Sequence, residues 1–268
     1  MNGILRKLGP KTLEFVLARQ KDDGGFGATL HLPSTIEDTY FGLSLLAMLT
    51  RASNDTKGIR ERISRSIQYL EGLRPQANWN PKTFYYYLLG RGIVGLETTP
   101  ETLNFLHCTQ RDHKRILEDL YYLCKARDKV GLEPLGIERL GASKIDFAQW
   151  RTVKELWLKL SVADLTSTEH RPEREDAINW VVACQNPDGG FGFYPGSTSF
   201  IENCHICFMV LEMLKASPRD AAAAQDFIFR CRTARGGFAR KNGAAPFLDA
   251  TWHAISSLKL LGPLLKGP

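Results

Sequence analysis

A motif of two glycines and a phenylalanine occurs three times in this chain, each time at the same distance from an acidic residue. The three copies are Gly24-Gly25-Phe26, Gly189-Gly190-Phe191 and Gly236-Gly237-Phe238, and the acids eleven positions after each phenylalanine are Glu37, Glu202 and Asp249. A fixed spacing in three separate segments indicates an internal repeat, which folds as copies of one structural unit.

Each copy of the motif separates two stretches with helical periodicity. Paired glycines suit the end of a helix, because glycine adopts a positive φ without steric cost. We expect the phenylalanine to fold back into the helix pair. After a loop, a second and more apolar helix is expected over 37–49, 202–214 and 249–261. Ser34 and Ser199 are the expected N-caps, each three residues before a glutamate.

The middle of the chain, residues 54–170, keeps the helical rhythm but lacks the motif. Helices are expected over about 58–72, 81–91, 99–110, 113–127 and 145–163, and no strand is expected. The clear repeats cover 12–50, 174–215 and 220–262. The pattern predicts one all-α domain over residues 1–268.

Composition excludes several other classes of protein. With 268 residues and 43% hydrophobic content, the chain can bury a large core and does not need disulfides. Six cysteines are too sparse for a disulfide scaffold, so we expect reduced thiols and a cytoplasmic protein. The net charge of +6 is too small to indicate nucleic acid as a partner. Neither a transmembrane segment nor a secretion signal is expected, because no long apolar run is present.

The run Gln-x-x-Asp-Gly-Gly-Phe-Gly from Gln20 and the later Ile-Glu-Asp-Thr-Tyr from Ile36 resemble the repeat of the prenyltransferase and squalene-cyclase family. This family includes the β subunits of protein prenyltransferases. The resemblance implies an α/α toroid, a ring of about five or six helix pairs around a central cavity. It also implies an isoprenoid or other hydrophobic ligand, and a helical partner subunit as a candidate.

Three functions are consistent with this resemblance. The first is a prenyltransferase-like protein that binds an isoprenoid diphosphate in an apolar cavity and transfers it to an acceptor. The second is an isoprenoid or terpene cyclase, although the Asp-x-Asp-Asp motif of such cyclases is missing and Glu37-Asp38 is the nearest acidic pair. The third is a non-catalytic toroid that binds a lipid or a protein. No catalytic residue is identified at this stage.

Aromatic and basic residues near the repeats are the candidates for substrate binding. The aromatic candidates are Tyr40, Phe41, Tyr86, Phe208 and Trp252, which either line a cavity or pack in the core. Aromatic faces attract cationic intermediates, as isoprenoid chemistry requires. Arg240 and Lys241 are candidates for a diphosphate, since arginine matches phosphate oxygens, and a solvated loop is the alternative.

Zinc is a candidate cofactor, because protein prenyltransferases bind it through Asp-x-Cys and a later histidine. Glu202-Asn203-Cys204 has that spacing with a longer acid, and Asp249 or His253 would supply the remaining ligand. All are acceptable zinc ligands. A structural role is the alternative, because Thr39 and Thr251 occupy the place of Cys204 in the other repeats. The acids would then stabilise helix N-termini.

Overall fold

Eleven helices and one short hairpin form the part of the chain that the computed structural model describes, residues 2–50, 57–76, 78–108, 116–133, 145–168 and 171–264. The elements in chain order are α1 (Asn2–Leu17), α2 (Ile36–Thr50), α3 (Lys57–Gly72), α4 (Pro81–Ile93), α5 (Pro100–Cys108), α6 (Ile116–Lys129), α7 (Val153–Thr166), α8 (Arg174–Ala183), α9 (Ile201–Met213), α10 (Ala221–Arg230), β1 (Phe238–Ala239), β2 (Pro246–Phe247) and α11 (Leu248–Leu264).

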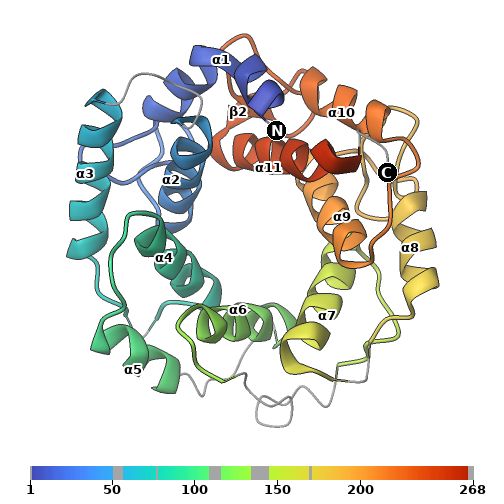
Figure 1. The fold of residues 1–268 in the computed structure, drawn as a ribbon, viewed down its shortest axis with the longest axis horizontal. Coiled ribbons are helices and arrows are strands. Elements are labelled where there is room, and N and C mark those ends of the chain that lie inside the picture. The colour runs from blue at the N-terminus through green and yellow to red at the C-terminus, as the bar shows by residue number, and fades with distance from the viewer. Residues whose placement is uncertain are drawn as a thin grey trace.

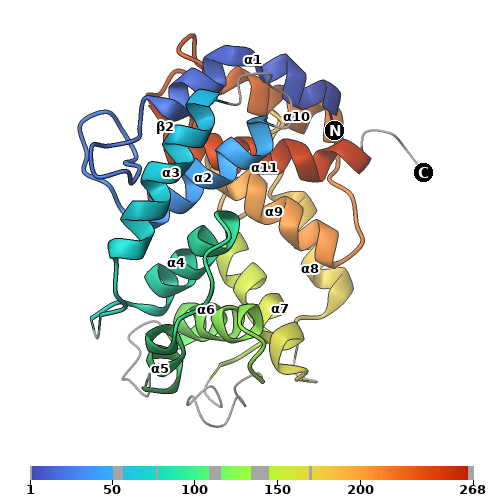
Figure 2. The ribbon, with the colours of Figure 1, turned by 60° about the vertical axis from the view of Figure 1, so that its left-hand side comes forward.

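The helices form a closed ring, as the repeat predicts. Helices α2, α4, α6, α7, α9 and α11 surround the centre, and α1, α3, α5, α8 and α10 lie outside them (Figure 1). Each inner helix contacts the next, and α11 contacts α2. Figure 2 shows α1 close to α10 and α11, so the two ends of the repeat array meet. Within the described residues, no outer helix separates α6 from α7.

The first glycine of each motif touches the following outer helix. A Cβ atom at Gly24 or Gly189 would collide with the main-chain carbonyl of Arg65 in α3 or of Ala223 in α10. At Gly236 it would collide with the carbonyl of Lys11 in α1, which is how the last repeat meets the first. All three glycines also have a positive φ, between 84° and 91°. The motif therefore requires glycine for two independent reasons.

The phenylalanine of each motif is completely buried, which confirms that it folds back into its helix pair. A side chain on the inner helix holds it there. The N–H of Phe26 donates to Thr39 Oγ1 at 3.0 Å, and the N–H of Phe238 donates to Thr251 Oγ1 at 2.9 Å. The first turn of the inner helix, which begins about eleven positions after the phenylalanine, is thus bonded directly to the motif.

The residue two positions after each phenylalanine joins neighbouring repeats. The carbonyl of Phe193 accepts from the N–H of Val153, and that of Arg240 accepts from the N–H of Ile201, both at 2.9 Å. These N–H groups belong to the first residues of α7 and α9, which have no partner within their own helices. Each glycine-rich loop therefore caps the inner helix of the repeat before it.

Three expectations about local structure are wrong. The N-cap of α2 is Thr35, whose Oγ1 accepts from the Asp38 N–H at 2.9 Å, and α9 has Phe200 at this position without a side-chain cap. Ser34 and Ser199 instead donate to the aspartates of the Asp-Gly-Gly turns. A strand pair is also present, because the third loop is tightened into the hairpin β1–β2.

The middle helices agree with the expected pattern except at one boundary. Helices α3 and α4 match the segments 58–72 and 81–91, and α5 and α6 cover most of the next two. Residues 109–115, where those two expected helices extend further, lie outside the described part. Helix α7 begins at Val153 and not near 145, because Thr152 caps it by accepting from the Glu155 N–H at 3.1 Å.

Candidate functional site

The first turn of every inner helix carries a charged side chain. In ring order these are Glu37 of α2, Lys82 of α4, Glu118 of α6, Lys154 of α7, Glu202 of α9 and Asp249 of α11. Neighbouring helices carry opposite charges at four of the six junctions, and two of these junctions form ion pairs. Lys82 Nζ lies 2.8 Å from Glu37 Oε1, and Lys154 Nζ lies 2.8 Å from Glu118 Oε1.

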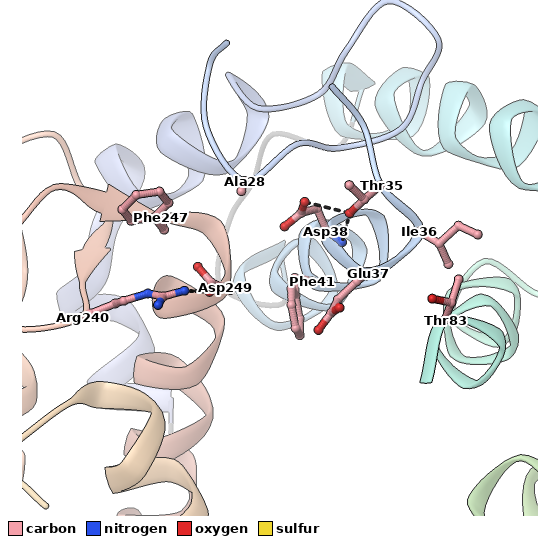
Figure 3. A pocket seen from close by; sticks show the side chains of 10 residues that line it. All are labelled: Ala28, Thr35, Ile36, Glu37, Asp38, Phe41, Thr83, Arg240, Phe247 and Asp249. Atoms are coloured by element: carbon pink, nitrogen blue, oxygen red, sulfur yellow. Dashed lines mark hydrogen bonds and ion pairs between the residues drawn. The ribbon is translucent and has the colours of Figure 1, made fainter. Parts of the chain in front are cut away.

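Arg240 completes this charged ring from outside the inner helices. It follows β1, so the hairpin holds its side chain between the first turns of α9 and α11. Its Nε lies 2.9 Å from Glu202 Oε1, and its Nη2 lies 2.9 Å from Asp249 Oδ2 (Figure 3). The two adjacent acids therefore share one guanidinium. The result is a ring of three ion-paired units at one mouth of the toroid.

Aromatic rings form a second layer, three or four residues further along the same helices. This layer consists of Tyr40, Phe41, Tyr85, Tyr86, Tyr121, Tyr122, Trp157, His205, Trp252 and His253. Residues three or four apart lie on one face of a helix, so each charged residue has a ring directly beneath it. The rings contact one another around a cavity of about 280 Å³, with centroids 5.1 Å apart for Tyr40–Tyr86 and 4.9 Å for Phe41–Trp252.

Two histidines interrupt the aromatic layer. His205 Nδ1 of α9 lies 2.9 Å from His253 Nδ1 of α11, and the Trp252 and His205 rings are perpendicular to each other with centroids 5.0 Å apart. Burial lowers the pKa of His205 well below its usual range and that of His253 to about 3. Both imidazoles are therefore neutral at pH 7.

A second pocket, of about 490 Å³, opens at the mouth between α2, α4 and α11 and shares Glu37 and Phe41 with the central cavity. Its most buried acid is Asp38, which is 8% exposed. The pKa of Asp38 is raised to about 6, mainly by burial. The hydrogen bond donated by the Thr35 hydroxyl opposes this shift, and the nearby charges of Asp249 and Glu37 add to it. Figure 3 shows Asp38 turned toward Thr35, with Glu37 and Phe41 on the opposite side.

The structure divides the predicted substrate-binding residues. Tyr40, Phe41, Tyr86 and Trp252 line the central cavity. Phe208 does not, because it is 1% exposed and packs edge-on against Phe191 in the core, with ring centroids 5.3 Å apart. The two basic candidates also separate: Arg240 lines the mouth pocket, whereas Lys241 is exposed and lines neither pocket.

The four predicted zinc ligands do not come together. Cys204 is fully buried, and its thiol bonds to the Phe191 backbone, as Thr39 and Thr251 bond to theirs. Glu202 and Asp249 are occupied by Arg240, and His253 by His205. Across the described ranges, no three His, Cys, Asp or Glu side chains form a group that could hold a metal. The residues do not fit zinc, and the small side chain at position 204 has the structural role that its threonine equivalents indicate.

Several cavity residues were missed by the sequence reasoning. They are Tyr85, Tyr121, Tyr122 and Trp157, together with Lys82, Glu118 and Lys154 above them. These lie on α4, α6 and α7, where the glycine motif is absent. A charged residue followed by an aromatic one at three or four positions was the available signal, because it recurs on every inner helix except α9, where a histidine takes the aromatic place.

This arrangement and the match of a family model place the chain in a known class. The model of the prenyltransferase α/α toroid domain matches residues 4–79 and 101–267, so the chain belongs to this family. A sequence comparison with curated proteins finds no match. None of the described helices is both long and apolar enough to cross a membrane.

The same fold occurs in solved structures of the type II terpene cyclase MstE from Scytonema. One variant in complex with geranylgeranyl dihydroxybenzoate, its substrate, has a TM-score of 0.61 at 12% identity, covering 98% of this chain and 99% of the other. A variant in complex with the product merosterolic acid A has a TM-score of 0.60 at 12% identity, covering 98% of each chain. At this identity, the likeness is one of fold.

Proposed function

We propose that this protein binds an isoprenoid chain in the central cavity. The observation that carries this proposal is the aromatic layer, to which α2, α4, α6, α7 and α11 contribute rings and α9 a histidine. A concave, largely apolar site with a few polar groups is typical of small-molecule binding. MstE, which has the same fold, is described with an isoprenoid substrate. The cavity of about 280 Å³ is near the lower end of ligand pockets, which favours a short chain.

The charged mouth favours a ligand without a diphosphate. Each cation there already has a carboxylate partner: Lys82 has Glu37, Lys154 has Glu118, and Arg240 has both Glu202 and Asp249. A diphosphate would have to displace these carboxylates and would meet their negative charge. We therefore prefer an uncharged isoprenoid to the isoprenoid diphosphate that the family resemblance implies.

Cyclisation started by protonation is the second candidate function, and Asp38 favours it. With a pKa of about 6, roughly a tenth of Asp38 carries a proton at pH 7, far more than an ordinary aspartate would. In this step the carboxylic acid gives its proton to one carbon of an alkene, whose electron pair forms the new C–H bond. The other alkene carbon becomes a cation, which the face of Phe41, a residue common to the mouth pocket and the central cavity, would stabilise. A second alkene of the chain closes the ring on this cation, and the loss of a proton to the Asp38 carboxylate gives the neutral product and restores the acid. Transfer to a zinc-bound thiolate has less support, because Cys204 faces the core.

Ligand binding can be measured by the fluorescence of the two tryptophans in the cavity, Trp157 and Trp252. We expect saturable quenching by geraniol or farnesol, and a much smaller response in a Trp252→Phe variant. Trp180→Phe, which changes a tryptophan outside the cavity, is the matched control and should keep the full response. If Trp180→Phe and Trp252→Phe respond alike, or if neither alcohol binds, the proposed site is wrong.

The cyclase candidate has a separate test. Incubation with farnesol, followed by gas chromatography and mass spectrometry, should give cyclic products of unchanged mass. Asp38→Asn should abolish these products and leave the affinity for farnesol unchanged. Binding without any product in the native protein would reject the cyclase candidate and leave the binding function intact.

A further inference from the structure

A further pocket, of about 550 Å³, lies where the outer helix α8 meets the segment that leads into α7. Its walls are formed by Ala148, Gln149 and Trp150 of that segment and by Asp176, Asn179 and Trp180 of α8. None of these residues lines the central cavity or the mouth pocket. We propose that this pocket binds a small soluble cation with a quaternary ammonium group, such as the one in choline. The proposal does not depend on the isoprenoid function.

The pocket occurs at the place where the ring of helices lacks a glycine motif. In the other repeats, an aromatic ring of the next outer helix packs on the second glycine of the motif so closely that a Cβ atom there would collide with it. These contacts join Tyr69 of α3 to Gly25, Phe227 of α10 to Gly190 and Phe15 of α1 to Gly237.

Trp180 has the corresponding place on α8 but a different neighbour. It lies nine residues before Gly189, as Phe15 and Phe227 lie nine residues before the first glycine of their own repeats. The segment 145–152 that precedes α7 contains no glycine, and Trp180 meets Trp150 there. Both tryptophans therefore stay partly exposed, whereas Phe15 and Phe227 are buried.

Contacts with the core hold both walls of the pocket in place. The carbonyl of Gln149 accepts a hydrogen bond from Lys159 Nζ of α7, a buried ammonium that also lies 2.8 Å from Glu155 Oε1. Trp150 and Trp180 both pack against the hydrophobic core with part of their surface. Walls that are fixed in advance lower the cost of ordering side chains when a ligand binds.

The two indoles form a corner whose faces suit a cation. Their ring planes are at 84° to each other, with centroids 6.2 Å apart. Among aromatic side chains, tryptophan attracts cations most strongly. Within the described ranges, the cations that lie over aromatic rings contact Phe15, Tyr86, Tyr87 and Phe247, so none of them occupies either indole.

Asp176 supplies the opposite charge. It lies four residues before Trp180 on α8, and residues at this spacing share one face of a helix. Its carboxylate has no ion pair or side-chain hydrogen bond within the part of the chain that the structure describes, because the adjacent Arg174 is held by Glu175 and by the Leu214 carbonyl. A quaternary ammonium carries no N–H, so the indole faces and one carboxylate are sufficient partners. A primary ammonium is more strongly hydrated and would lose more on entering the pocket.

The charges around the pocket favour a soluble ligand over a phospholipid headgroup. In phosphatidylcholine the quaternary ammonium is accompanied by a phosphate. The start of α8 carries the acids Glu175 and Asp176, and the N-cap Glu173 already accepts the N–H groups of both. A phosphate would therefore meet negative charge and find these helix N–H groups occupied.

Choline and dimethylbutanol, its uncharged carbon analogue, provide the test because they have nearly the same shape. The chain has five tryptophans, so their indole N–H signals can be followed separately by nitrogen-15 NMR at constant ionic strength. We expect choline to shift the signals of Trp150 and Trp180 and to leave that of Trp252 unchanged. Dimethylbutanol should bind this pocket at least about fivefold more weakly than choline.

Two variants test the two parts of the site. Trp150→Ala should weaken choline binding about fivefold, read from the Trp180 signal, because one cation–π contact is lost. Asp176→Asn should weaken it about threefold, the effect of one exposed charge pair. Asp226→Asn, which changes an exposed carboxylate on α10, is the matched control and should keep the native affinity.

Three results would overturn the proposal. Equal affinity for choline and dimethylbutanol would mean that the pocket is merely apolar, and native affinity in Asp176→Asn would remove the role of the charge. Co-sedimentation of the protein with phosphatidylcholine vesicles that is lost in Asp176→Asn would assign the site to a lipid headgroup and not to a soluble cation. Should Trp150→Ala fail to fold, the native indole signals and Asp176→Asn decide, since Asp176 is exposed and its replacement leaves the core intact.

Discussion

The carbonyl oxygen of Ala28 accepts a hydrogen bond from the N–H of Leu248 at 3.1 Å, although the two residues are 220 positions apart. Leu248 is the first residue of α11, and Ala28 lies two positions after the phenylalanine of the first repeat. The same bond joins Phe193 to Val153 and Arg240 to Ile201 within the chain. Closure of the ring therefore uses the contact that already links neighbouring repeats, and needs no special element.

The contact of Gly236 with α1 should be essential for this closure. Gly236→Ala places a methyl group against the Lys11 carbonyl at a φ of 91°, so we expect a loss of at least about 2 kcal/mol in the free energy of unfolding. Urea denaturation measures it. Gly262→Ala is the matched control, because it lies in α11 with no atom near its added Cβ and should stabilise by up to about 1 kcal/mol. Equal stability of the two variants would contradict this closure.

Cys204 should behave as a structural residue and not as a metal ligand. In Cys204→Ser the hydroxyl can still accept from the Phe191 N–H, as Thr39 and Thr251 do in their repeats. We expect this variant to stay within about 1 kcal/mol of the native protein and Cys204→Ala to lose about 1–3 kcal/mol, because the buried N–H is left unpaired. Chemical denaturation compares them. Greater stability of the alanine variant than of the serine variant would rule out this role.

Asp38 should make stability depend on pH in a defined direction. Its pKa is about 6 in the folded protein and 3.8 in an unfolded chain, so the folded state holds its proton more tightly. The native protein therefore loses stability as pH rises from about 4 to about 6, by up to about 3 kcal/mol from this group.

Asp38→Asn removes this dependence and should be more stable than the native protein at pH 8 but not at pH 4. Urea denaturation at both values measures the difference. Asp226→Asn, at an exposed carboxylate on α10, is the control and should show the native pH profile. If Asp38→Asn keeps the pH profile of the native protein, the carboxyl group of Asp38 does not have the raised pKa and this prediction is wrong.

Removing one carboxylate partner of Arg240 should raise the affinity of the mouth for a diphosphate ligand. In the native protein we expect geranyl diphosphate to bind no more tightly than geraniol, because Glu202 and Asp249 both hold the guanidinium. Asp249→Asn removes one of these carboxylate charges, and geranyl diphosphate should then bind several-fold more tightly, an effect that added salt reduces. Lys241→Gln, which changes a cation outside both pockets, should not alter either affinity. Strong, salt-sensitive binding of geranyl diphosphate by the native protein would contradict the proposal that the ligand is an uncharged isoprenoid.

Which aromatic residues face the cavity could be predicted from the sequence only in part. Tyr40, Phe41, Tyr86 and Trp252 could be identified, but so was Phe208, which lies in the core. Inner helices are buried on the cavity side and on the side of the outer helices, so apolar residues occur all around them. Helical periodicity then cannot separate the two faces, as Cys204 and His205, neighbours on α9, demonstrate.

What the sequence by itself determined is the ring of helix pairs, because the Gly-Gly-Phe spacing repeats a contact that is local within each repeat. Tertiary structure alone decided the charged mouth and the histidine pair. Arg240 meets Glu202 and Asp249, and His205 meets His253, only when separate segments are brought side by side. Their protonation and pairing follow from burial and from neighbours 38 to 48 residues away or across a hairpin, which no local pattern in the chain encodes.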